Sequence, residues 1–323
     1  MGVSLRERLE LEHPVVGAGL GGGLSRSRLT VAIGEAGGLG QLGIMPPGML
    51  RAELSAHRVR SDRPVAVNML LPFARSGHWE VARDADAVVT FWGEPRRRTD
   101  GVWIHQCGSV AEARAAVDAG ADGVIAQGVE AGGHVRGTTP ALELLAQVRA
   151  ALPAGFPVWL AGGVAERDDA RAALDAGADA VLVGTRFLLS EESDAHPDYK
   201  RRLLGADTTV LTELFGAGWP AQHRVVPNRA TERWLRDDAR GPAWVRGLHR
   251  ATAPALSRLP IAMVSRASHR QRPGSPLLGP AAPVTGDPDS LLDAGALYAG
   301  ECVARISSLR PAGELVRELA SAA

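Results

Sequence analysis

The sequence predicts an α/β protein, a (β/α)8 barrel with an accessory, mostly helical segment near the C-terminus. Eight short, nearly continuous apolar runs recur along the chain, and most are followed by a helical pattern. Such runs are typical of strands buried on both faces, and their alternation with helices indicates a parallel sheet. An internal repeat supports this prediction, because "AVDAGADGVIAQG" (116–128) and "ALDAGADAVLVGT" (173–185) align without gaps. Repeated helix–turn–strand units together with eight strands favour a closed barrel.

A doubly wound sheet is the alternative architecture. The run "GAGLGGG" (17–23) resembles a dinucleotide-binding turn, but no GxGxxG opens the first βα turn. No acidic residue closes a second strand at the distance that such a motif requires. The barrel therefore agrees better with the pattern.

The expected strands follow one another in a regular order along the first two thirds of the chain. They cover residues 14–19, 39–43, 64–70, 87–93, 102–108, 123–128, 157–163 and 180–185. Only "EPRRRTD" separates the fourth strand from the fifth, whereas a parallel crossover with a helix needs about ten or more residues. We therefore predict an irregular barrel that lacks the helix after strand four.

The strand–helix rhythm stops after the eighth strand, and this change predicts the domain organisation. Residues 1–205 are expected to form the barrel, and residues 206–290, rich in proline and tryptophan, an accessory segment over the barrel mouth. Residues 291–323 are expected to return to the barrel as C-terminal helices.

Composition excludes several classes of protein. The 323 residues carry 36 basic and 36 acidic side chains, and this zero net charge argues against a nucleic-acid partner. No stretch of about 18 apolar residues predicts a membrane span, and the N-terminus lacks the apolar core of a secretory signal. The cysteines Cys107 and Cys302 form neither a metal-spaced pair nor a disulfide framework, and the histidines show no ligand spacing. We expect a cytoplasmic protein without a bound metal.

Neutral amides lie where three of the expected strands end. Asn68, Gln106 and Gln127 each come at or near the carboxyl end of a strand, where the active sites of such barrels form. Amides both donate and accept hydrogen bonds, which suits the edge of a flavin ring. Each amide could instead satisfy a neighbouring backbone group. Three at one end of a barrel favour a polar planar ligand.

Glycines mark the ends of strands one, seven and eight. Loops after strands seven and eight of such barrels frequently bind phosphate, because glycines let backbone N–H groups approach the oxygens. The candidate cofactor-binding residues at these ends are Gly19, Leu20, Gly162, Gly163, Leu182, Val183, Gly184 and Thr185. These positions predict a phosphorylated ligand.

A single histidine lies in the glycine-rich stretch "QGVEAGGHVRG" (127–137) that follows strand six. We expect this stretch to be a loop at the barrel mouth, with Gly132 and Gly133 allowing a ligand close approach. Histidine titrates near neutral pH and is the most common general acid or base. His134 is therefore the candidate catalytic residue.

Several motifs together resemble the nitronate monooxygenase family, formerly called 2-nitropropane dioxygenases. They are "AIGEAGGLGQLG" (32–43), "VIAQGVEAGGHVRG" (124–137), "VWLAGGVAERDDARAALDAGADAVLVGTRFLLSEES" (158–193) and "HRVVPN" (223–228), spread over most of residues 13–305. The resemblance implies a barrel flavoprotein that uses FMN to oxidise alkyl nitronates, or the parent nitroalkanes, with O2 to a carbonyl compound and nitrite. It implies that FMN binds at Asn68, Gln127, Gly132, Gly163 and 182–185, with His134 as the base.

Besides the lost helix after strand four, the chain departs from the family pattern in two places. The family usually carries a proline–methionine pair at the end of strand one, where this chain has Gly19 and Leu20. Near the C-terminus the family usually has "AGQ", and here Gly300 is followed by Glu301. Both changes lie where the family surrounds its flavin or substrate, so they affect the substrate more than the cofactor.

Two other functions agree with the same motifs. The "EAGGH" sequence also occurs in FMN-dependent enoyl-acyl-carrier-protein reductases, so an NAD(P)H-using reductase of that type, or a quinone reductase, is the alternative. A barrel that binds flavin without catalysis is the second alternative. The expected partners are a small nitronate and O2, and the sequence is compatible with a homodimer.

Overall fold

The protein forms two compact units in this computed structural model, which describes residues 4–258 and 267–322. The first unit consists of Met1–Glu130, Arg136–Ser193 and Ser308–Ala323, and the second of Ala131–Val135 and Asp194–Ser307. The second unit thus begins at 194, where the sequence suggested 206, because α9 (Pro197–Leu204) packs on the 3-10 helix η1 (Glu301–Arg305). It ends at 307 rather than 290, and it takes five residues from the stretch after strand six.

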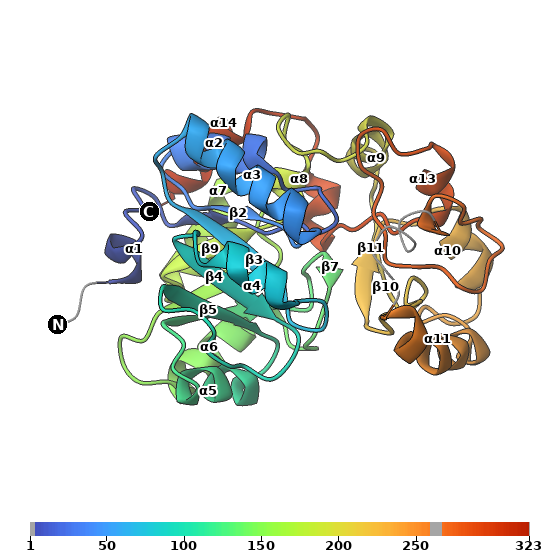
Figure 1. Cartoon of the computed structure of the whole chain (residues 1–323), viewed down its shortest axis with the longest axis horizontal. Coiled ribbons are helices and arrows are strands. Elements are labelled where there is room, and N and C mark those ends of the chain that lie inside the picture. Colours follow the sequence, from blue (N-terminus) through green and yellow to red (C-terminus); the bar gives the residue numbers. More distant parts are fainter. Residues whose placement is uncertain (1–3, 259–266, 323) are drawn as a thin grey trace. The chain divides into compact units, whose positions relative to one another are not determined.

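The first unit contains the predicted barrel (Figure 1). Its strands occur in the order β1-β9-β8-β6-β5-β4-β3-β2, all parallel. They are β1 (Val15–Gly17), β2 (Gly40–Leu42), β3 (Val65–Leu70), β4 (Ala87–Phe91), β5 (Val102–Cys107), β6 (Gly123–Gln127), β8 (Val158–Ala161) and β9 (Ala180–Val183). A parallel bridge between Val16 and Leu39 joins β1 to the chain entering β2. The backbone bond from Gly17 N to Leu39 O, 2.9 Å long, closes the ring.

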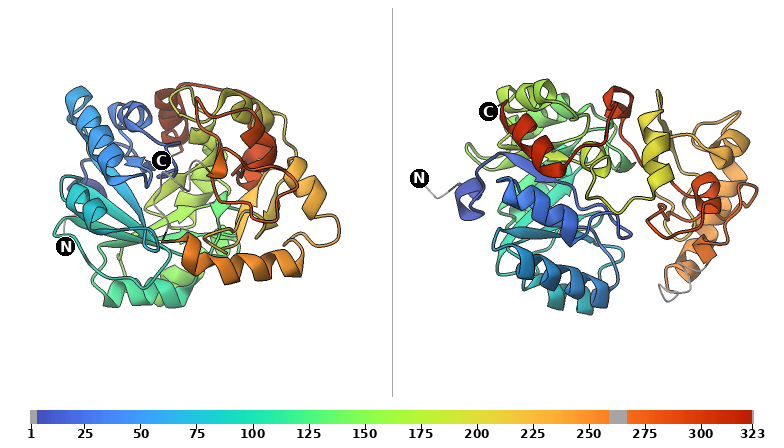
Figure 2. Two further views of the ribbon diagram at one scale, coloured as in Figure 1. Left: turned by 45° about the vertical axis from the view of Figure 1, so that its right-hand side comes forward. Right: turned by 90° about the horizontal axis from the view of Figure 1, so that it is seen from above.

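Helices surround the ring of strands, as the further views in Figure 2 show. They are α2 (Ser27–Glu35), α3 (Pro47–Arg60), α4 (Ser76–Ala82), α5 (Val110–Asp118), α6 (Ala141–Ala151), α7 (Arg167–Asp175), α8 (Thr185–Leu188) and the C-terminal α14 (Ala312–Ala320). The helix α14 packs against α2 and α7, so the chain's tail returns to the barrel unit.

The predicted absence of a helix between β4 and β5 is confirmed. The connection is instead held by Arg97, whose guanidinium lies 5.7 Å from the Trp103 ring and bonds to Gly120 O and Asp122 Oδ2. On the same outer face Thr90 Oγ1 accepts from Trp103 Nε1 and bonds to His105 Nδ1, each at 2.8 Å. A loop with one arginine thus replaces the helix as cover for this face, and His105 has a structural partner.

Burial on both faces explains why the strands appear as continuous apolar runs. Val15 packs outward among residues of the surrounding helices, and Val16, its neighbour, packs inward with Leu39, Ile104 and Leu182. Successive strand residues point to opposite sides, so each strand needs apolar groups at nearly every position.

The repeated "GAD" turns have a structural function. In both copies, and in the similar "DAD" turn at 84–86, the aspartate just before a strand accepts a bond from an N–H near the start of the neighbouring strand: Asp86 from Val65, Asp122 from Trp103 and Asp179 from Val158. Arg58, Arg97 and Arg149 pair with these three carboxylates in the same order. The glycines before them, Gly120 and Gly177, have φ of +84° and +96°, as residues that end helices often do. The repeat therefore sets strand register at the amino ends of the barrel.

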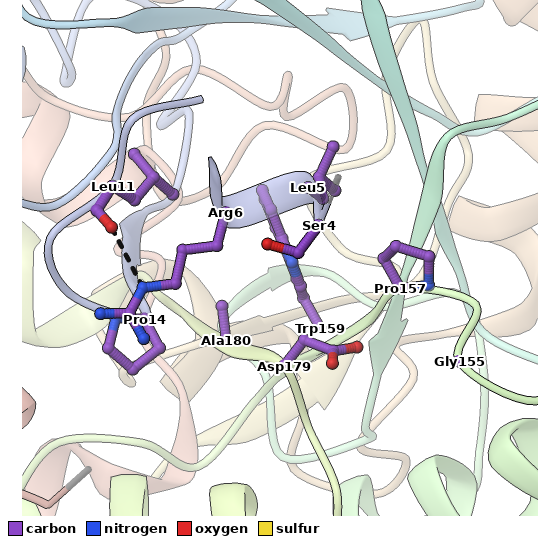
Figure 3. A pocket seen from close by; sticks show the side chains of 10 residues that line it. All are labelled: Ser4, Leu5, Arg6, Leu11, Pro14, Gly155, Pro157, Trp159, Asp179 and Ala180. Atoms are coloured by element: carbon purple, nitrogen blue, oxygen red, sulfur yellow. Dashed lines mark hydrogen bonds between the residues drawn. The ribbon is translucent and has the colours of Figure 1, made fainter. Parts of the chain in front are cut away.

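The short helix α1 (Leu5–Arg8) covers the amino end of the barrel, since Leu5, Leu9 and Leu11 belong to the interior cluster. A pocket lies beside it (Figure 3). Its lining includes Pro14, Pro157 and Asp179, which precede β1, β8 and β9. The polar groups there are already paired, since Arg6 donates to Leu11 O and Glu12 O. This pocket is at the opposite end of the strands from the predicted site.

The second unit contains the expected helices together with a small sheet that the sequence did not predict. The sheet has the order β10-β11-β7, with antiparallel pairs. The strands are β7 (Gly133–His134), β10 (Val210–Thr212) and β11 (His223–Val225), and the other helices are α10 (Arg229–Trp234), α11 (Ala243–Leu256) and α13 (Ser290–Ala294). Leu214, Phe215, Val225 and Val245 form its core.

Candidate functional site

Three predicted amides lie on the inward face of the barrel, at the carboxyl ends of their strands. The ladders pair Asn68 with Val89, Gln106 with Ile125 and Gln127 with Ala161, and these partners are members of the interior cluster. All three amides are buried, with at most 7% of the residue exposed. The strand period therefore places them together at one end of the barrel.

Two of these amides have unmet hydrogen-bonding capacity. Among the described residues, no hydrogen bond is formed by the side chain of Asn68 or Gln106, whereas Gln127 Oε1 accepts from Arg136 N at 3.3 Å. Unlike those of Gln41, the amide atoms of Asn68 and Gln106 keep some accessible surface, so a ligand can reach them. The donor and acceptor edges of Asn68 and Gln106 therefore suit a polar ligand such as a flavin ring.

Sequence reasoning missed a fourth amide, Gln41. It lies on β2 in register with the interior residue Ala66, is 1% exposed, and both its amide atoms are buried without a partner in the described part of the chain. The alternation of β2 could have indicated it, but the strand is only three residues long.

Gly19 has a packing reason within the barrel. A Cβ at Gly19 would clash with the Asn68 side chain and would lie 3.2 Å from Leu42 O. Similarly, a Cβ at Gly43 would clash with the carbonyl of Leu20. The departure from the family pattern at Gly19 and Leu20 thus accompanies a close approach of strand one to Asn68.

The ends of β8 and β9 place several backbone groups together. Gly162 and Gly163 have φ of +111° and +79°, which glycine adopts readily, and a Cβ on Gly163 would have only one neighbour within 4 Å, at 3.9 Å. Leu182 faces the interior, whereas Val183 faces the outer helices and its carbonyl accepts from Ala18 N. Gly184 precedes α8, which Thr185 begins. The strand ends therefore carry backbone conformations that glycine readily adopts, with room beside Gly163.

Trp92, which follows β4, adds a feature that the sequence did not predict. Its φ is +59°, an uncommon conformation for a residue with a side chain. The Arg136 guanidinium lies 4.9 Å from the Trp92 ring and pairs with Glu112. Such strain persists where surrounding contacts hold it, here an arginine that arrives from after β6.

The stretch after strand six is not the loop that we expected. Gly133 and His134 form β7 and pair with Arg224 and His223 of β11. The expectation was wrong because the pairing partner is some ninety residues further along the chain. Glu130, just before this strand, accepts from Ala141 N at 3.0 Å and so caps α6.

The glycines of this strand have reasons within their own unit. A Cβ on Gly132 would clash with the backbone of Ala299 and Gly300. Gly133 has open space around it but a φ of +73°. One glycine is therefore required by packing and the other by backbone conformation.

His134 is surrounded by three aromatic rings that the sequence did not identify. Its imidazole stacks on Trp219 with centroids 3.7 Å apart and planes at 24°. The rings of His223 and Tyr298 lie 5.3 Å and 5.4 Å away. Removal from water, followed by the proximity of His223, lowers the pKa of His134 well below its usual 6.5. The imidazole is therefore neutral at pH 7 and able to accept a proton.

The rings around His134 are themselves held in place. His223 Nε2 accepts from Phe215 N at 3.2 Å, so Nδ1 carries the proton and donates to Ala221 O at 2.8 Å. Burial lowers the pKa of His223 to about 4, which keeps it neutral. Tyr298 donates to Pro280 O, and Tyr199 donates to Tyr298 O. The motif "HRVVPN" contains His223, but nothing in the sequence indicates this role.

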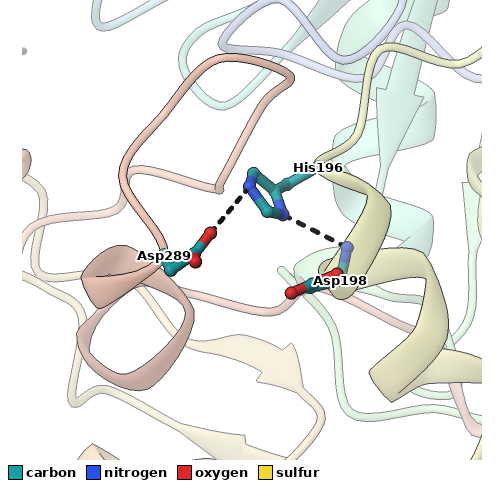
Figure 4. A group of neighbouring side chains, drawn as sticks. All are labelled: His196, Asp198 and Asp289. Atoms are coloured by element: carbon teal, nitrogen blue, oxygen red, sulfur yellow. Dashed lines mark hydrogen bonds and ion pairs between the residues drawn. The ribbon is translucent and has the colours of Figure 1, made fainter.

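Among the described residues, one group of side chains in the second unit could hold a metal ion (Figure 4). His196 Nε2 lies 3.3 Å from Asp289 Oδ1, while Nδ1 accepts from Asp198 N. The imidazole thus caps α9, Asp198 pairs with Arg201, and the Asp289 side chain is 82% exposed. We assign His196 this capping role.

Comparisons with known proteins agree with this architecture. Residues 94–322 match the sequence model of the family described as nitronate monooxygenase. The (3aS,4S,5R,7aS)-5-hydroxy-7a-methyl-1-oxo-octahydro-1H-indene-4-carboxyl-CoA dehydrogenase of Mycobacterium tuberculosis is 34% identical over 260 residues, which are 76% of this chain and 72% of that protein.

Two solved structures are similar over nearly the whole chain. FabK from Thermotoga maritima has a TM-score of 0.77 and 27% identity, covering 100% of this chain and 96% of that one. Nitroalkane oxidase from Streptomyces ansochromogenes has a TM-score of 0.76 and 28% identity, covering 99% of each chain.

Within the residues that the structure describes, none of the helices has the length and apolar character needed to cross a membrane. The family is one of flavoenzymes, so the chain is an oxidoreductase rather than a barrel that binds flavin without catalysis. The family match, the parallel barrel and the unpartnered amides lead to one conclusion: this chain belongs to the nitronate monooxygenase family.

Proposed function

We propose that the chain is an FMN-dependent monooxygenase that oxidises alkyl nitronates, or nitroalkanes after deprotonation, with O2 to a carbonyl compound and nitrite. The observation that carries this proposal is the pair of buried amides, Asn68 and Gln106, without partners among the described residues at the carboxyl end of the barrel. These are the groups that a flavin edge would satisfy. The flavin, when bound, supplies the redox chemistry between substrate and O2.

The roles proposed for the barrel residues follow from their chemistry. Asn68, Gln106 and Gln127 would bind the ring through their amides, with Gly19 and Leu20 beside Asn68. Backbone N–H groups at the ends of β8 and β9 would bind the phosphate, since glycines allow its oxygens to approach closely. The residues in this second group are Gly162, Gly163, Leu182, Val183, Gly184 and Thr185. We assign Gly132 and Gly133 to the cofactor as well, in addition to their packing and conformational roles.

His134 is proposed as the base for neutral nitroalkanes. Its lowered pKa keeps the imidazole unprotonated at neutral pH, so it can take the proton from the carbon that bears the nitro group. A preformed nitronate has already lost this proton. The two substrates therefore separate the role of His134 from the rest of the reaction.

An NAD(P)H-dependent reductase is the second candidate function. The observation in its favour is the likeness to FabK over the whole chain, and the relative from Mycobacterium tuberculosis acts on a CoA thioester. Both activities use a flavin barrel, so the fold does not separate them.

One purified sample tests these proposals. The absorption spectrum and chromatography of the released flavin should show FMN near one per chain; FAD would contradict the cofactor, and a colourless protein that takes up neither would contradict both functions. Under anaerobic conditions we expect ethylnitronate to reduce the flavin and NADH or NADPH to do so slowly. Reduction by NAD(P)H but not by nitronate would favour the reductase.

The remaining proposals concern assembly and location. We propose a homodimer in the cytoplasm, with a small anionic substrate and O2 as the partners of the reaction. Light scattering of the purified protein tests the first, and fractionation of cells tests the second.

A further inference from the structure

The proposed function gives no role to the stacking contact between His134 and Trp219. With centroids 3.7 Å apart and planes at 24°, the two rings overlap face to face. Trp219 is 9% exposed, and its position is set by a tight turn in which its N–H donates to Gly216 O and its carbonyl accepts from Ala221 N. Gly218 within this turn has a φ of +82°. These bonds fix the backbone that carries the indole.

The two other rings beside His134 carry no charge at neutral pH. His223 is fixed in its neutral form by Phe215 and Ala221, and burial raises the pKa of Tyr298 so that its hydroxyl stays protonated. Arg224, the next residue on β11, pairs with Glu301 at 2.9 Å. Tyr199, which donates to Tyr298 O, is also neutral because its pKa is raised.

The indole face therefore has a specific electrostatic consequence for His134. Aromatic faces are electron-rich and attract cations, and tryptophan does so most strongly. When the substrate C–H bond breaks, the proton forms an N–H bond on the imidazole and the electron pair remains on the nitronate. The imidazolium that results lies against the indole.

We propose that Trp219 is the positioning residue of His134, which holds the plane of the imidazole and stabilises the imidazolium formed on proton uptake. This inference rests on the proposed function, in which His134 is the base. A cation–π contact is worth about 0.5–2 kcal/mol, which corresponds to about a 3- to 30-fold effect on the proton affinity of the ring.

The variants Trp219→Phe and Trp219→Leu separate this role from simple packing. Phenylalanine and leucine are both smaller than tryptophan and similar to each other in volume, but only phenylalanine keeps an aromatic face. On the flavin-loaded protein, nuclear magnetic resonance of 15N-labelled histidine gives the proton affinity of His134 during titration from neutral to acidic pH. The kcat of each variant is also measured, once with a neutral nitroalkane and once with its preformed nitronate.

We expect the leucine variant to bind the proton about 3- to 30-fold more weakly than the phenylalanine variant. Its kcat for the nitroalkane should fall by a similar factor, while preformed nitronate is affected much less. Equal proton affinities in the two variants would overturn the inference. Should the leucine variant fail to fold, as circular dichroism would show, Trp219→Met gives the same comparison without a ring.

The base role of His134 and the stacking role of Trp219 can be tested separately. Where His134 variants turn over nitroalkane normally but Trp219→Leu still weakens proton binding, the base role is wrong and the effect of the stack is retained. Where His134→Ala abolishes nitroalkane turnover and the phenylalanine and leucine variants behave alike, the base role is retained and the stack is packing alone.

Discussion

The two units of the molecule hold their candidate site residues in different ways. In the barrel, Asn68 and Gln106 are placed by parallel ladders, so their direction follows from the alternation of the strand. In the second unit, His134 lies on a two-residue strand, and its ring is placed by Trp219, His223 and Tyr298. The amides of the barrel are thus placed by regular backbone structure. His134 is placed by side-chain packing between segments that are distant in the sequence. The barrel amides should therefore tolerate mutation with local effects, whereas His134 and the rings around it should respond as a group.

The largest expected effect concerns His134. His134→Ala should reduce turnover of a neutral nitroalkane by about 10²- to 10⁴-fold, the range typical of a lost general base. Flavin binding in the barrel should be unaffected, and preformed nitronate serves as the matched substrate control. In the wild type, nitroalkane turnover should not decline as pH falls to 6.5, because the pKa of His134 lies well below that value. Equal loss with both substrates would exclude the base role.

The glycines beside His134 test how tightly packing defines the second unit. Gly132→Ala should destabilise this unit by about 3 kcal/mol, because the new Cβ clashes with backbone of Ala299 and Gly300. Gly133→Ala, with open space and only the unfavourable φ of +73°, should cost about 1 kcal/mol. Hydrogen exchange of peptides from residues 194–307 measures both. If Gly133→Ala destabilised the unit more than Gly132→Ala, the close contact of Gly132 with Ala299 and Gly300 would not be formed in solution.

A pH titration compares one histidine in each unit. Burial lowers the pKa of both His105 and His223 to about 4. The unfolded chain therefore binds more protons than the folded one between pH 6.5 and 4, so stability falls as pH decreases across that window. Each residue should account for about 2–3 kcal/mol at its lower end. Exchange rates of peptides around residues 105 and 223, followed against pH, should accelerate in both units.

The corresponding variants sharpen this comparison. His223→Gln should flatten the pH dependence of the second unit and leave that of the barrel unchanged, while His105→Gln should do the reverse. If the pH dependence of stability were unchanged in both variants, other buried histidines, such as His57 or His249, would control acid stability.

The smallest effect is expected for single amides of the barrel. Asn68→Ala and Gln106→Ala should each weaken flavin binding about 10-fold, which is the loss of one hydrogen-bonded group. Asn228→Ala provides the control in the second unit. Its amide caps α10 and donates to Leu292 O and Gly295 O, so its loss should lower stability but leave the flavin dissociation constant within about 2-fold. Fluorescence titration of flavin-depleted protein measures all three.

Much of the barrel could be predicted from the chain. All eight strands form where apolar runs and following glycines indicated, and the short "EPRRRTD" connection correctly predicted the absent helix. The "GAD" repeats predicted recurrent units, although the register role of their aspartates required the hydrogen bonds. The placement of Asn68 and Gln106 at one end of the barrel was predictable, because strand ends meet at one edge of a parallel barrel.

The second unit was harder to predict, for a physical reason. β7 has two residues and pairs with a strand that begins at His223, so no local period signals it. The rings around His134 come from positions 219, 223 and 298, and they are held by hydrogen bonds to backbone or by a turn. Non-local side-chain contacts of this kind leave no regular trace in a sequence.

By itself the sequence determined the barrel, because strands buried on both faces and helices buried on one face need different apolar periods. It also determined which residue types lie at the strand ends, and the alternation of side chains along each strand determined which of them face the interior of the barrel. Only the tertiary structure decided that His134 belongs to a strand of the second unit, stacked on Trp219. It also decided that Gly132 is required by the backbone of Ala299 and Gly300. Those arrangements depend on packing between segments far apart in the chain, which local propensity and periodicity do not encode.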